Sequence, residues 1–354
     1  MRTPLITAVL LALGCLQACA TRPSNALAPS LPERHASCTP LLRASGGPPE
    51  PREAPAATTK TATAQDFTGL WETRYGRMRL SADGPRIRGT YAYAGQSRLR
   101  GEVTEGELHF TYEQPDGEVG EGVFRLGVDG DSFDGSWTSR GGRGGPWRGT
   151  RVLPEAGRRW LVVLEANWEG GLHEAEYSYG EMLRSFFTRE PKVAVRHRFV
   201  SDLADLRRWC AEVVYLAEPV VLYLSSHGTE EGISLGVEEA GAEELIAALA
   251  DLPDLELLHF GSCSVMGGEI PTRITDAREG AARFPISGFT RPADWAGSAV
   301  VDFTFLELVL VRGLAPHRAL EATREMVSFA RESSEGPIAG SGLAIHAPRS
   351  AGGE

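Results

Sequence analysis

The sequence has too few cysteines for a disulfide framework. Only five occur in 354 residues. Cys15, Cys19 and Cys38 fall in the N-terminal region, Cys210 lies in the helical pattern DLADLRRWCAEVVYL, and Cys263 follows a short apolar run. A small secreted domain held together by disulfides would need several pairs of cysteines at regular spacing. The arrangement of these five cysteines excludes that class of protein. We expect Cys210 to be a core residue.

Three further kinds of site are missing from the sequence. Zinc needs three or four ligands at short spacing, and scattered histidines with one cysteine do not supply them. No Gly-rich loop follows a strand and opens a helix, so nucleotide binding has no support. A net charge of −11 argues against nucleic acid as a partner. We therefore expect no metal, no cofactor and no nucleic acid.

The chain begins with a targeting segment. Arg2 precedes the apolar run PLITAVLLALG, which is too short to span a bilayer and suits a secretory signal. Residues 16–19 then read LQAC, a lipobox in which Cys19 would be acylated. Cys15 is a poorer match, and cleavage after Ala20 is a further alternative.

These features predict an exported lipoprotein anchored in the membrane of the cell envelope. Residues 1–19 would be the signal peptide, and Ala20 rather than Asp after the acylated cysteine favours the outer membrane. Residues 20–65 are rich in Pro, Ala, Thr and Ser without apolar periodicity. Such a segment cannot offset its ordering entropy, so we expect a disordered tether.

Residues 66–152 have the pattern of an all-β domain. Alternating segments such as RMRLSADGPRIRGTYAY and ELHFTYEQPDGE are broken by Gly and Asp-Gly. About eight strands at this spacing predict an antiparallel meander that forms a small barrel or sandwich. Recurring Gly-x-Trp and Trp-x-Gly units resemble those of avidin- and lipocalin-like barrels.

Five aromatic residues stand out in this domain: Trp71, Tyr91, Phe110, Trp137 and Trp147. Rings of this kind most often fill the core of a narrow barrel, and we expect that role here. A ligand cavity lined by the same rings is the alternative. An unidentified ligand of the β-domain therefore stays open as a partner.

From Arg159 onward, apolar strands alternate with helical segments. The order predicts a doubly wound α/β domain over residues 159–348, with a six-stranded, mostly parallel sheet and helices on both faces. The helix that ends before Gly313 carries Asp302, so we expect it to be buried in protein rather than in a membrane. Residues 349–354 would be a flexible tail.

Two neighbouring strands of this domain carry candidate catalytic residues. His227 and Gly228 follow the run 220–224, and Cys263 follows the run 255–260. Adjacent parallel strands end on the same edge of a sheet, where ligands bind, so these residues would lie side by side. A thiol becomes a nucleophile at neutral pH when a base lies beside it. The spacing therefore predicts a Cys263–His227 dyad.

Each member of the pair also has an ordinary interpretation. A lone cysteine at a strand end usually packs, and a lone histidine after a strand is usually a loop residue. Two other histidines are rival bases, His197 and His259. His259 lies within a strand, so we expect it to pack under the sheet.

The strand ending in His-Gly and the strand ending in a cysteine between small residues resemble the caspase-like (clan CD) cysteine peptidases, including metacaspases and CHAT-type proteases. RWLVVLEANW (159–168) is similar to the first strand and loop of metacaspase-like domains, and ISGFTRPADW (286–295) to a fifth strand and loop. The resemblance spans about residues 159–347. It departs from better-known members at Gly261, where an acid or glutamine is usual.

This resemblance implies a caspase-like fold and a cysteine endopeptidase acting on peptides or proteins. It implies an oxyanion hole formed by the N–H groups of Gly228 and Cys263. It also places Glu165 and Asp294 where such folds shape the first specificity pocket, although acids near strand ends often serve as caps. The alternatives are an inactive scaffold in a binding lipoprotein whose β-domain recognises the ligand, and a cysteine hydrolase of esters or other amides.

Overall fold

The computed structural model describes residues 61–169, 171–253, 255–278, 284–331 and 340–347. The signal peptide, Cys19, Cys38 and most of the predicted tether lie outside these ranges, as does the tail 349–354. All described elements belong to the unit Thr58–Glu354, and its division near residues 152–159 stays a prediction. None of the described helices is long and apolar enough to cross a membrane.

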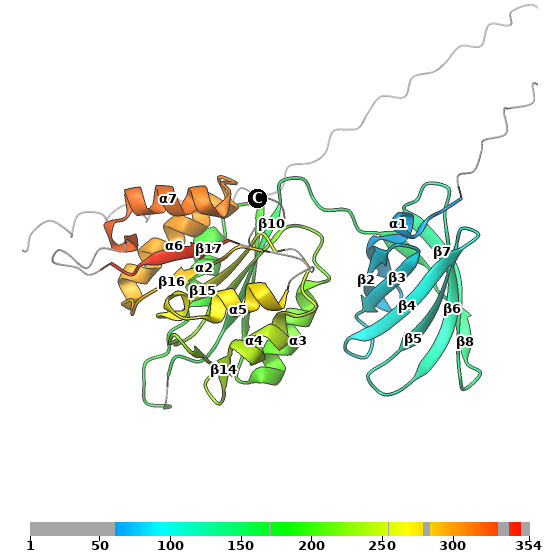
Figure 1. Ribbon diagram of the computed structural model, residues 1–354, viewed down its shortest axis with the longest axis horizontal. Coiled ribbons are helices and arrows are strands. Elements are labelled where there is room, and N and C mark those ends of the chain that lie inside the picture. The colour runs from blue at the N-terminus through cyan, green and yellow to red at the C-terminus, as the bar shows by residue number, and fades with distance from the viewer. Residues whose placement is uncertain (1–60, 170, 254, 279–283, 332–339, 348–354) are drawn as a thin grey trace, which may run out of the picture. The chain divides into compact units, whose positions relative to one another are not determined.

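The first part of the described chain is an antiparallel β-barrel (Figure 1). Its strands are β1 (Gly69–Thr73), β2 (Gly76–Asp83), β3 (Arg86–Tyr91), β4 (Ser97–Thr104), β5 (Glu107–Glu113), β6 (Val119–Leu126), β7 (Ser132–Ser139), β8 (Gly144–Pro146) and β9 (Gly149–Arg151). The sheet order is β6-β5-β4-β3-β2-β1-β9-β7-β8, and the additional β6–β7 pairing closes the ring. Strand β8 pairs with β7 alone. Closure leaves the ring without the unpaired edges on which open sheets aggregate.

Aromatic side chains fill the barrel interior. The sequence predicts this role for five named rings, and the structure confirms it for four of them. Trp71, Tyr91, Phe110 and Trp147 are at most 3% exposed. Trp137 is only partly buried. Inward-facing glycines make room for the rings, since a Cβ at Gly122 would lie 2.4 Å from the Phe110 ring.

A short helix precedes the barrel and corrects the predicted end of the tether. Helix α1 (Ala64–Phe67) begins inside the stretch 20–65 that the sequence assigns to the tether. Ala64 and Phe67 are buried in the barrel core, and the indole N–H of Trp71 donates to the Phe67 carbonyl at 2.9 Å. The composition of the segment is polar, but these two apolar side chains pack in the barrel core, and Arg151 donates to the carbonyls of Asp66 and Thr68 at 2.7 Å.

The second part contains a six-stranded sheet in the order β11-β10-β12-β15-β16-β17. These strands are β10 (Arg159–Glu165), β11 (Val193–Phe199), β12 (Val220–Ser225), β15 (Leu257–Gly261), β16 (Ile286–Phe289) and β17 (Leu343–His346). Neighbouring strands are parallel except for β16 and β17, which are antiparallel. A separate hairpin joins β13 (Gly232–Ser234) and β14 (Glu239–Gly241).

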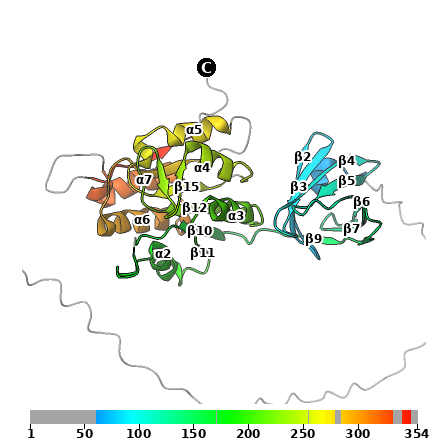
Figure 2. The ribbon, with the colours of Figure 1, turned by 90° about the horizontal axis from the view of Figure 1, so that it is seen from below.

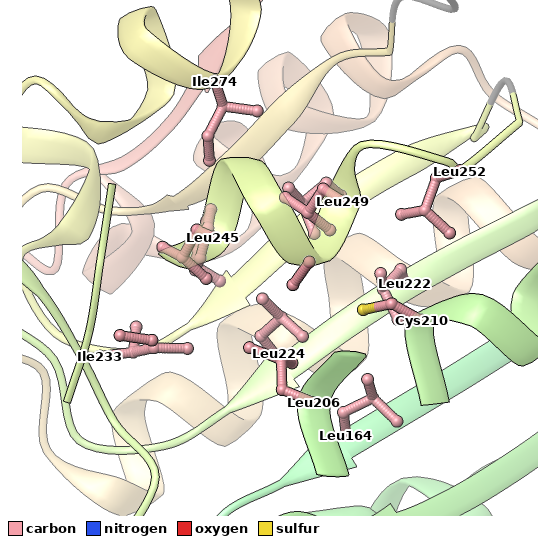
Figure 3. Close-up of a cluster of buried hydrophobic side chains, with 14 of the residues drawn as sticks. Leu164, Leu206, Cys210, Leu222, Leu224, Ile233, Leu245, Leu249, Leu252 and Ile274 are labelled. Carbon is pink, nitrogen blue, oxygen red and sulfur yellow. The ribbon is translucent and has the colours of Figure 1, made fainter. Parts of the chain in front are cut away.

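Helices cover both faces of this sheet (Figure 2). One face packs against α3 (Leu203–Val213), α4 (Ala242–Leu249) and α5 (Ile270–Ala277). The other packs against α2 (Tyr179–Phe187), α6 (Trp295–Leu310) and α7 (Pro316–Met326). Cys210 is 1% exposed among leucines of the first face, as expected, and burial raises the pKa of its thiol to about 12 (Figure 3).

The predicted fold class needs a correction. The sequence predicts a caspase-like α/β sheet as the main architecture, with the all-β domain as an addition. The largest sheet of the described protein is instead the antiparallel one, with nine strands against six, and eight of its strands form a closed barrel. The sequence shows strand alternation clearly, but closure depends on the β6–β7 and β1–β9 pairings, which alternation does not specify.

Candidate active site

The register of two parallel strands brings the candidate residues to one edge of the six-stranded sheet. Ser225, the last residue of β12, is paired with Gly261, the last residue of β15. The next residues along each chain also meet, because the hydroxyls of Ser226 and Ser262 lie 3.0 Å apart and are hydrogen-bonded. The loops that carry His227 and Cys263 therefore start from neighbouring points.

The two loops are in close contact beyond these serines. A Cβ on Gly228 would lie 2.8 Å from Ser262 Cβ and 2.9 Å from the Cys263 carbonyl oxygen. A Cβ on Gly268 would lie 2.1 Å from the carbonyl oxygen of Glu230. Only glycine fits at either point, so these glycines allow the loop after β12 to lie directly against the loop after β15.

Cys263 is partly buried, and its thiol points towards the loop between β16 and α6. The Ala293 N–H donates to Sγ at 3.4 Å, and Sγ lies 3.7 Å from the Ala293 carbonyl oxygen. The following residue, Ser264, has left-handed backbone geometry with φ 61°. A non-glycine residue rarely adopts this conformation, and such outliers gather at functional sites.

His227 is exposed, and its position is fixed through its backbone and its ring. Its carbonyl accepts from the Ser234 N–H at 2.9 Å. Its ring meets the Trp168 ring edge-on, with centroids 4.9 Å apart. Among the described residues, the hydrogen-bonding partner of the Cys263 thiol is Ala293 rather than this imidazole. Catalytic hydrogen bonds are often unformed without substrate, so the arrangement leaves the dyad prediction standing.

Two backbone N–H groups at this edge find no acceptor among the described residues. Within the described part of the chain, neither the Gly228 N–H nor the Cys263 N–H donates a hydrogen bond. The resemblance noted from the sequence implies that these same groups bind an oxyanion. Unpaired amides beside a thiol are the arrangement that stabilises negative charge on a tetrahedral intermediate.

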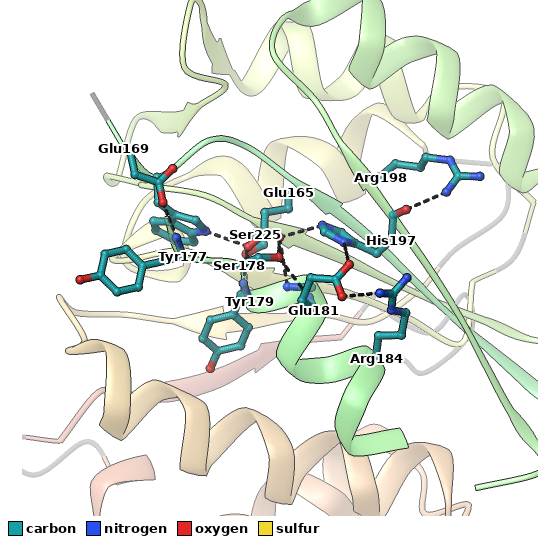
Figure 4. A network of polar contacts seen from close by, with 12 residues as sticks. Glu165, Glu169, Tyr177, Ser178, Tyr179, Glu181, Arg184, His197, Arg198 and Ser225 are labelled. Atoms are coloured by element: carbon teal, nitrogen blue, oxygen red, sulfur yellow. Dashed lines mark hydrogen bonds and ion pairs between the residues drawn. The ribbon is translucent and has the colours of Figure 1, made fainter. Parts of the chain in front are cut away.

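Glu165 lies at the end of β10 but is fully buried rather than open to a substrate (Figure 4). Its carboxylate accepts from Trp168 Nε1 (2.9 Å), Ser178 Oγ (2.7 Å), Tyr179 N (2.5 Å), Gly180 N (3.1 Å) and Ser225 Oγ (3.4 Å). It also pairs with His197 Nε2 at 2.7 Å. These contacts anchor the N-terminus of α2 and the Trp168 side chain, and they give Glu165 a structural role in place of the suggested pocket.

The second suggested pocket residue, Asp294, is the N-cap of α6. Its side chain is exposed and accepts from the Gly297 N–H at 2.9 Å. An aspartate at this position satisfies one of the free amides of the first turn, so capping explains the residue fully.

His197, one of the rival bases, belongs to the Glu165 network. Its side chain is 5% exposed and also lies 3.3 Å from Glu181. Burial alone would lower its pKa, but hydrogen bonding to Glu165 and the charges of both glutamates raise it. Burial alone would raise the pKa of Glu165, but hydrogen bonds from His197, Ser178 and Trp168 lower it.

The other rival base, His259, packs under the sheet as expected. Strand register places Tyr223, His259 and Ser287 side by side on three successive strands. His259 Nδ1 lies 2.7 Å from Ser287 Oγ, and Nε2 lies 3.1 Å from the Asp302 carboxylate of α6. Tyr223 Oη donates to Asp302 at 2.5 Å. Sequence analysis found the buried histidine but missed its partners, which only the strand register brings together.

This buried network determines the residue two before the cysteine. A Cβ on Gly261 would lie 2.1 Å from Tyr223 Oη. The hydroxyl cannot move away freely because it is bonded to Asp302. The presence of glycine at position 261 therefore has a steric cause within this chain.

The described residues contain no group of three or more His, Cys, Asp or Glu side chains that could hold a metal ion. The chemistry available at the edge is that of the Cys263 thiol, the His227 imidazole and the free amides.

Comparison with known proteins finds no matching family model and no matching curated protein. Among solved structures, the chain is similar to a secreted C11 cysteine protease from Bacteroides thetaiotaomicron in complex with an irreversible peptide inhibitor. Identity is 10% and the TM-score 0.38, over 54% of this chain and 66% of that one, just under two thirds of its length. The chain is also similar to pro-sf-caspase-1, with 13% identity and a TM-score of 0.34 over 55% and 93% of the two chains. Similarities at these TM-scores do not establish the expected caspase-like class.

The Glu165–His197 pair predicts a pH-dependent stability. Because the pKa of His197 is raised in the folded state, its contribution is complete below the unfolded value of about 6.5 and is lost as pH rises through the folded pKa. Glu165 contributes above about 4.3, and its share is lost as pH falls through its lowered pKa. Urea unfolding of His197→Gln should therefore show its largest deficit, at least about 1 kcal/mol, near pH 6.

That deficit should shrink as the pH is raised towards alkaline values. His317→Gln, which alters an exposed histidine in α7, is the matched control and should not reproduce the deficit near pH 6. A pH-independent deficit for His197→Gln would contradict the assignment.

The Gly261–Tyr223 contact predicts a steric coupling. Gly261→Ala should destabilise the protein by about 1–3 kcal/mol, because the new methyl group overlaps the Tyr223 hydroxyl. The same methyl group would lie 2.3 Å and 2.5 Å from two Tyr223 ring carbons, so the second change has to remove the ring. Adding Tyr223→Leu should recover part of the loss, and a double-mutant cycle in urea should give a coupling of about 0.5 kcal/mol or more. Strict additivity of the two changes would disprove the contact.

Proposed function

We propose that this protein is a cysteine endopeptidase in which Cys263 is the nucleophile and His227 is the general acid–base. The observation that supports this proposal most strongly is the packing of the loop after β12 against the loop after β15. This packing brings the Cys263 thiol to the same sheet edge as the N–H groups of Gly228 and Cys263, which find no acceptor among the described residues. The exposed imidazole of His227 lies on the first of these loops.

The proposed reaction uses only groups at this edge. His227 accepts the Cys263 proton, and the thiolate forms a C–S bond with a peptide carbonyl carbon. The N–H groups of Gly228 and Cys263 hydrogen-bond the resulting oxyanion. Protonated His227 then donates its proton to the departing amine as the C–N bond breaks, which leaves a thioester that water hydrolyses with His227 as base.

For this reaction the His227 imidazole has to lie within hydrogen-bonding reach of the Cys263 thiol. Its ring contacts Trp168, which is partly exposed and is held by Glu165 through the indole N–H. Trp168 also meets the Trp295 ring, with centroids 5.4 Å apart, and Trp295 follows Ala293 by two residues. An aromatic wall thus links the loop around His227 to the loop that contacts the thiol, and a substrate bound against it would exclude water.

The dyad predicts loss of activity without loss of stability. Cys263→Ala removes the nucleophile, and His227→Ala removes the base that would take the thiol proton. Both variants should fail to cleave a peptide library. Neither should lower the melting temperature by much, because His227 is exposed and Cys263 is only partly buried.

Labelling with iodoacetamide distinguishes a Cys263 thiol activated by His227 from the cysteine of a non-catalytic scaffold. The reagent should modify Cys263 in preference to buried Cys210, at a rate that falls in His227→Ala and not in the control His317→Ala. Cys210→Ala should keep activity while losing about 1 kcal/mol or more of stability. If cleavage is undetectable and labelling does not depend on His227, the non-catalytic scaffold is the better description.

We further propose that the mature protein is lipid-anchored through Cys19 in the cell envelope. The support is the lipobox LQAC after a short apolar run. Cys19→Ala should move the protein from the membrane to the soluble fraction and remove labelling by a radioactive fatty acid. Cys15→Ala, the matched control, should do neither. Retention of Cys19→Ala in the membrane with full labelling would refute the assignment.

A further inference from the structure

One end of the barrel contains a small cavity that the proposed peptidase chemistry does not use. Its volume is about 70 Å³, which has room for roughly five to seven water molecules. Six aromatic residues form its walls: Tyr75, Tyr91, Tyr93, Tyr112, Trp137 and Trp147. Most come from strand ends and turns at this end of the barrel, so the cavity is part of the fold and does not depend on a surface loop alone.

Three buried polar atoms of the cavity walls have no partner among the described residues. Tyr91, Tyr112 and Trp147 are 1%, 3% and 2% exposed, and within the described part of the chain the two tyrosine hydroxyls and the Trp147 indole N–H make no hydrogen bond. The other lining indole, that of Trp137, donates to Tyr75 Oη at 2.7 Å. A buried polar group without a partner is costly, and a bound ligand or water removes that cost.

The charged groups of the cavity cancel each other. Glu118 and Arg143 line it and form an ion pair with each other. The Glu118 side chain is 23% exposed and that of Arg143 is 72% exposed, so the carboxylate is the more enclosed of the two. Gln114 is the remaining polar lining residue. A ligand therefore meets no net charge, and it finds donors and acceptors on the same walls.

We propose that this cavity binds one neutral sugar ring. The C–H groups of a pyranose pack well against the electron-rich faces of aromatic rings. Its hydroxyls both donate and accept, so one can accept from the donor-only Trp147 N–H while another donates to Glu118 or Tyr112. An ammonium group has no acceptor for Trp147, and an apolar ligand would leave all three of these polar atoms unpaired. The ligand class is thus a hexopyranose unit, free or at the end of a glycan.

The test titrates the full chain with methyl β-glucopyranoside, methyl α-mannopyranoside and N-acetylglucosamine while tryptophan fluorescence is recorded. At least one sugar should shift the emission of the two lining tryptophans saturably at tens of millimolar or below. Tyr112→Phe removes one hydrogen bond and Glu118→Gln replaces a charge-assisted hydrogen bond by a weaker neutral one, so each should weaken that binding by up to about tenfold. Glu121→Gln is the matched control. It changes an exposed carboxylate of β6, three residues after Glu118, and should leave affinity unchanged.

Folding and binding are separable in these variants. Tyr112→Phe keeps the ring and removes a hydroxyl that has no partner among the described residues, so its melting temperature should not fall. Absence of any saturable shift with all three sugars would overturn the proposal. So would binding that Tyr112→Phe and Glu118→Gln leave intact, or binding of n-butylammonium in place of the sugars. None of these outcomes bears on peptide cleavage, which depends on His227 and Cys263.

Discussion

The buried carboxylate of Glu165 joins β10, β11, β12 and the start of α2 in the α/β part. A charge removed from water must be compensated by partners, because desolvation otherwise costs several kcal/mol. Glu165 meets this requirement with the first turn of α2, with the His197 imidazole and with the Trp168 indole. Through Trp168 the same carboxylate reaches the ring of His227, so a structural charge positions a residue of the candidate site.

The candidate site could be predicted from sequence to the extent that parallel strand order determines it. Two apolar runs separated by a helix are enough to place His227 and Cys263 at one edge, and β12 and β15 have this order and register. The roles of Glu165 and Asp294 could not be predicted in the same way. An acid at a strand end can face a pocket, cap a helix or pair with a buried histidine, and only the tertiary partners decide among these.

The barrel was predictable from alternation and the frequent turns, but its closure and cavity were not. Period-two alternation states which residues face inward, and it gives Phe110 and Tyr112 the same side of β5. Which rings reach the middle of the barrel and which surround its end depends on strand stagger, which the sequence pattern does not carry. Trp137 and Trp147 are ten residues apart and look alike in sequence. Both line the cavity, but Trp147 is 2% exposed, whereas Trp137 is only partly buried and donates its indole N–H to Tyr75 Oη.

The backbone on both sides of Cys263 in the sequence is constrained by contacts with other elements. Tyr223, bonded to Asp302, occupies the space that a side chain at Gly261 would need, and Ser264 keeps a left-handed conformation immediately after the cysteine. Left-handed geometry at a serine persists only when surrounding contacts over-determine it. Two hydrogen bonds hold Ser264 in this conformation. Its carbonyl oxygen accepts from the Gly267 N–H at 2.8 Å, and its N–H donates to the Arg291 carbonyl oxygen at 3.3 Å. A thiol presented from so constrained a turn loses little freedom on meeting a substrate, which is the property that an attacking nucleophile requires.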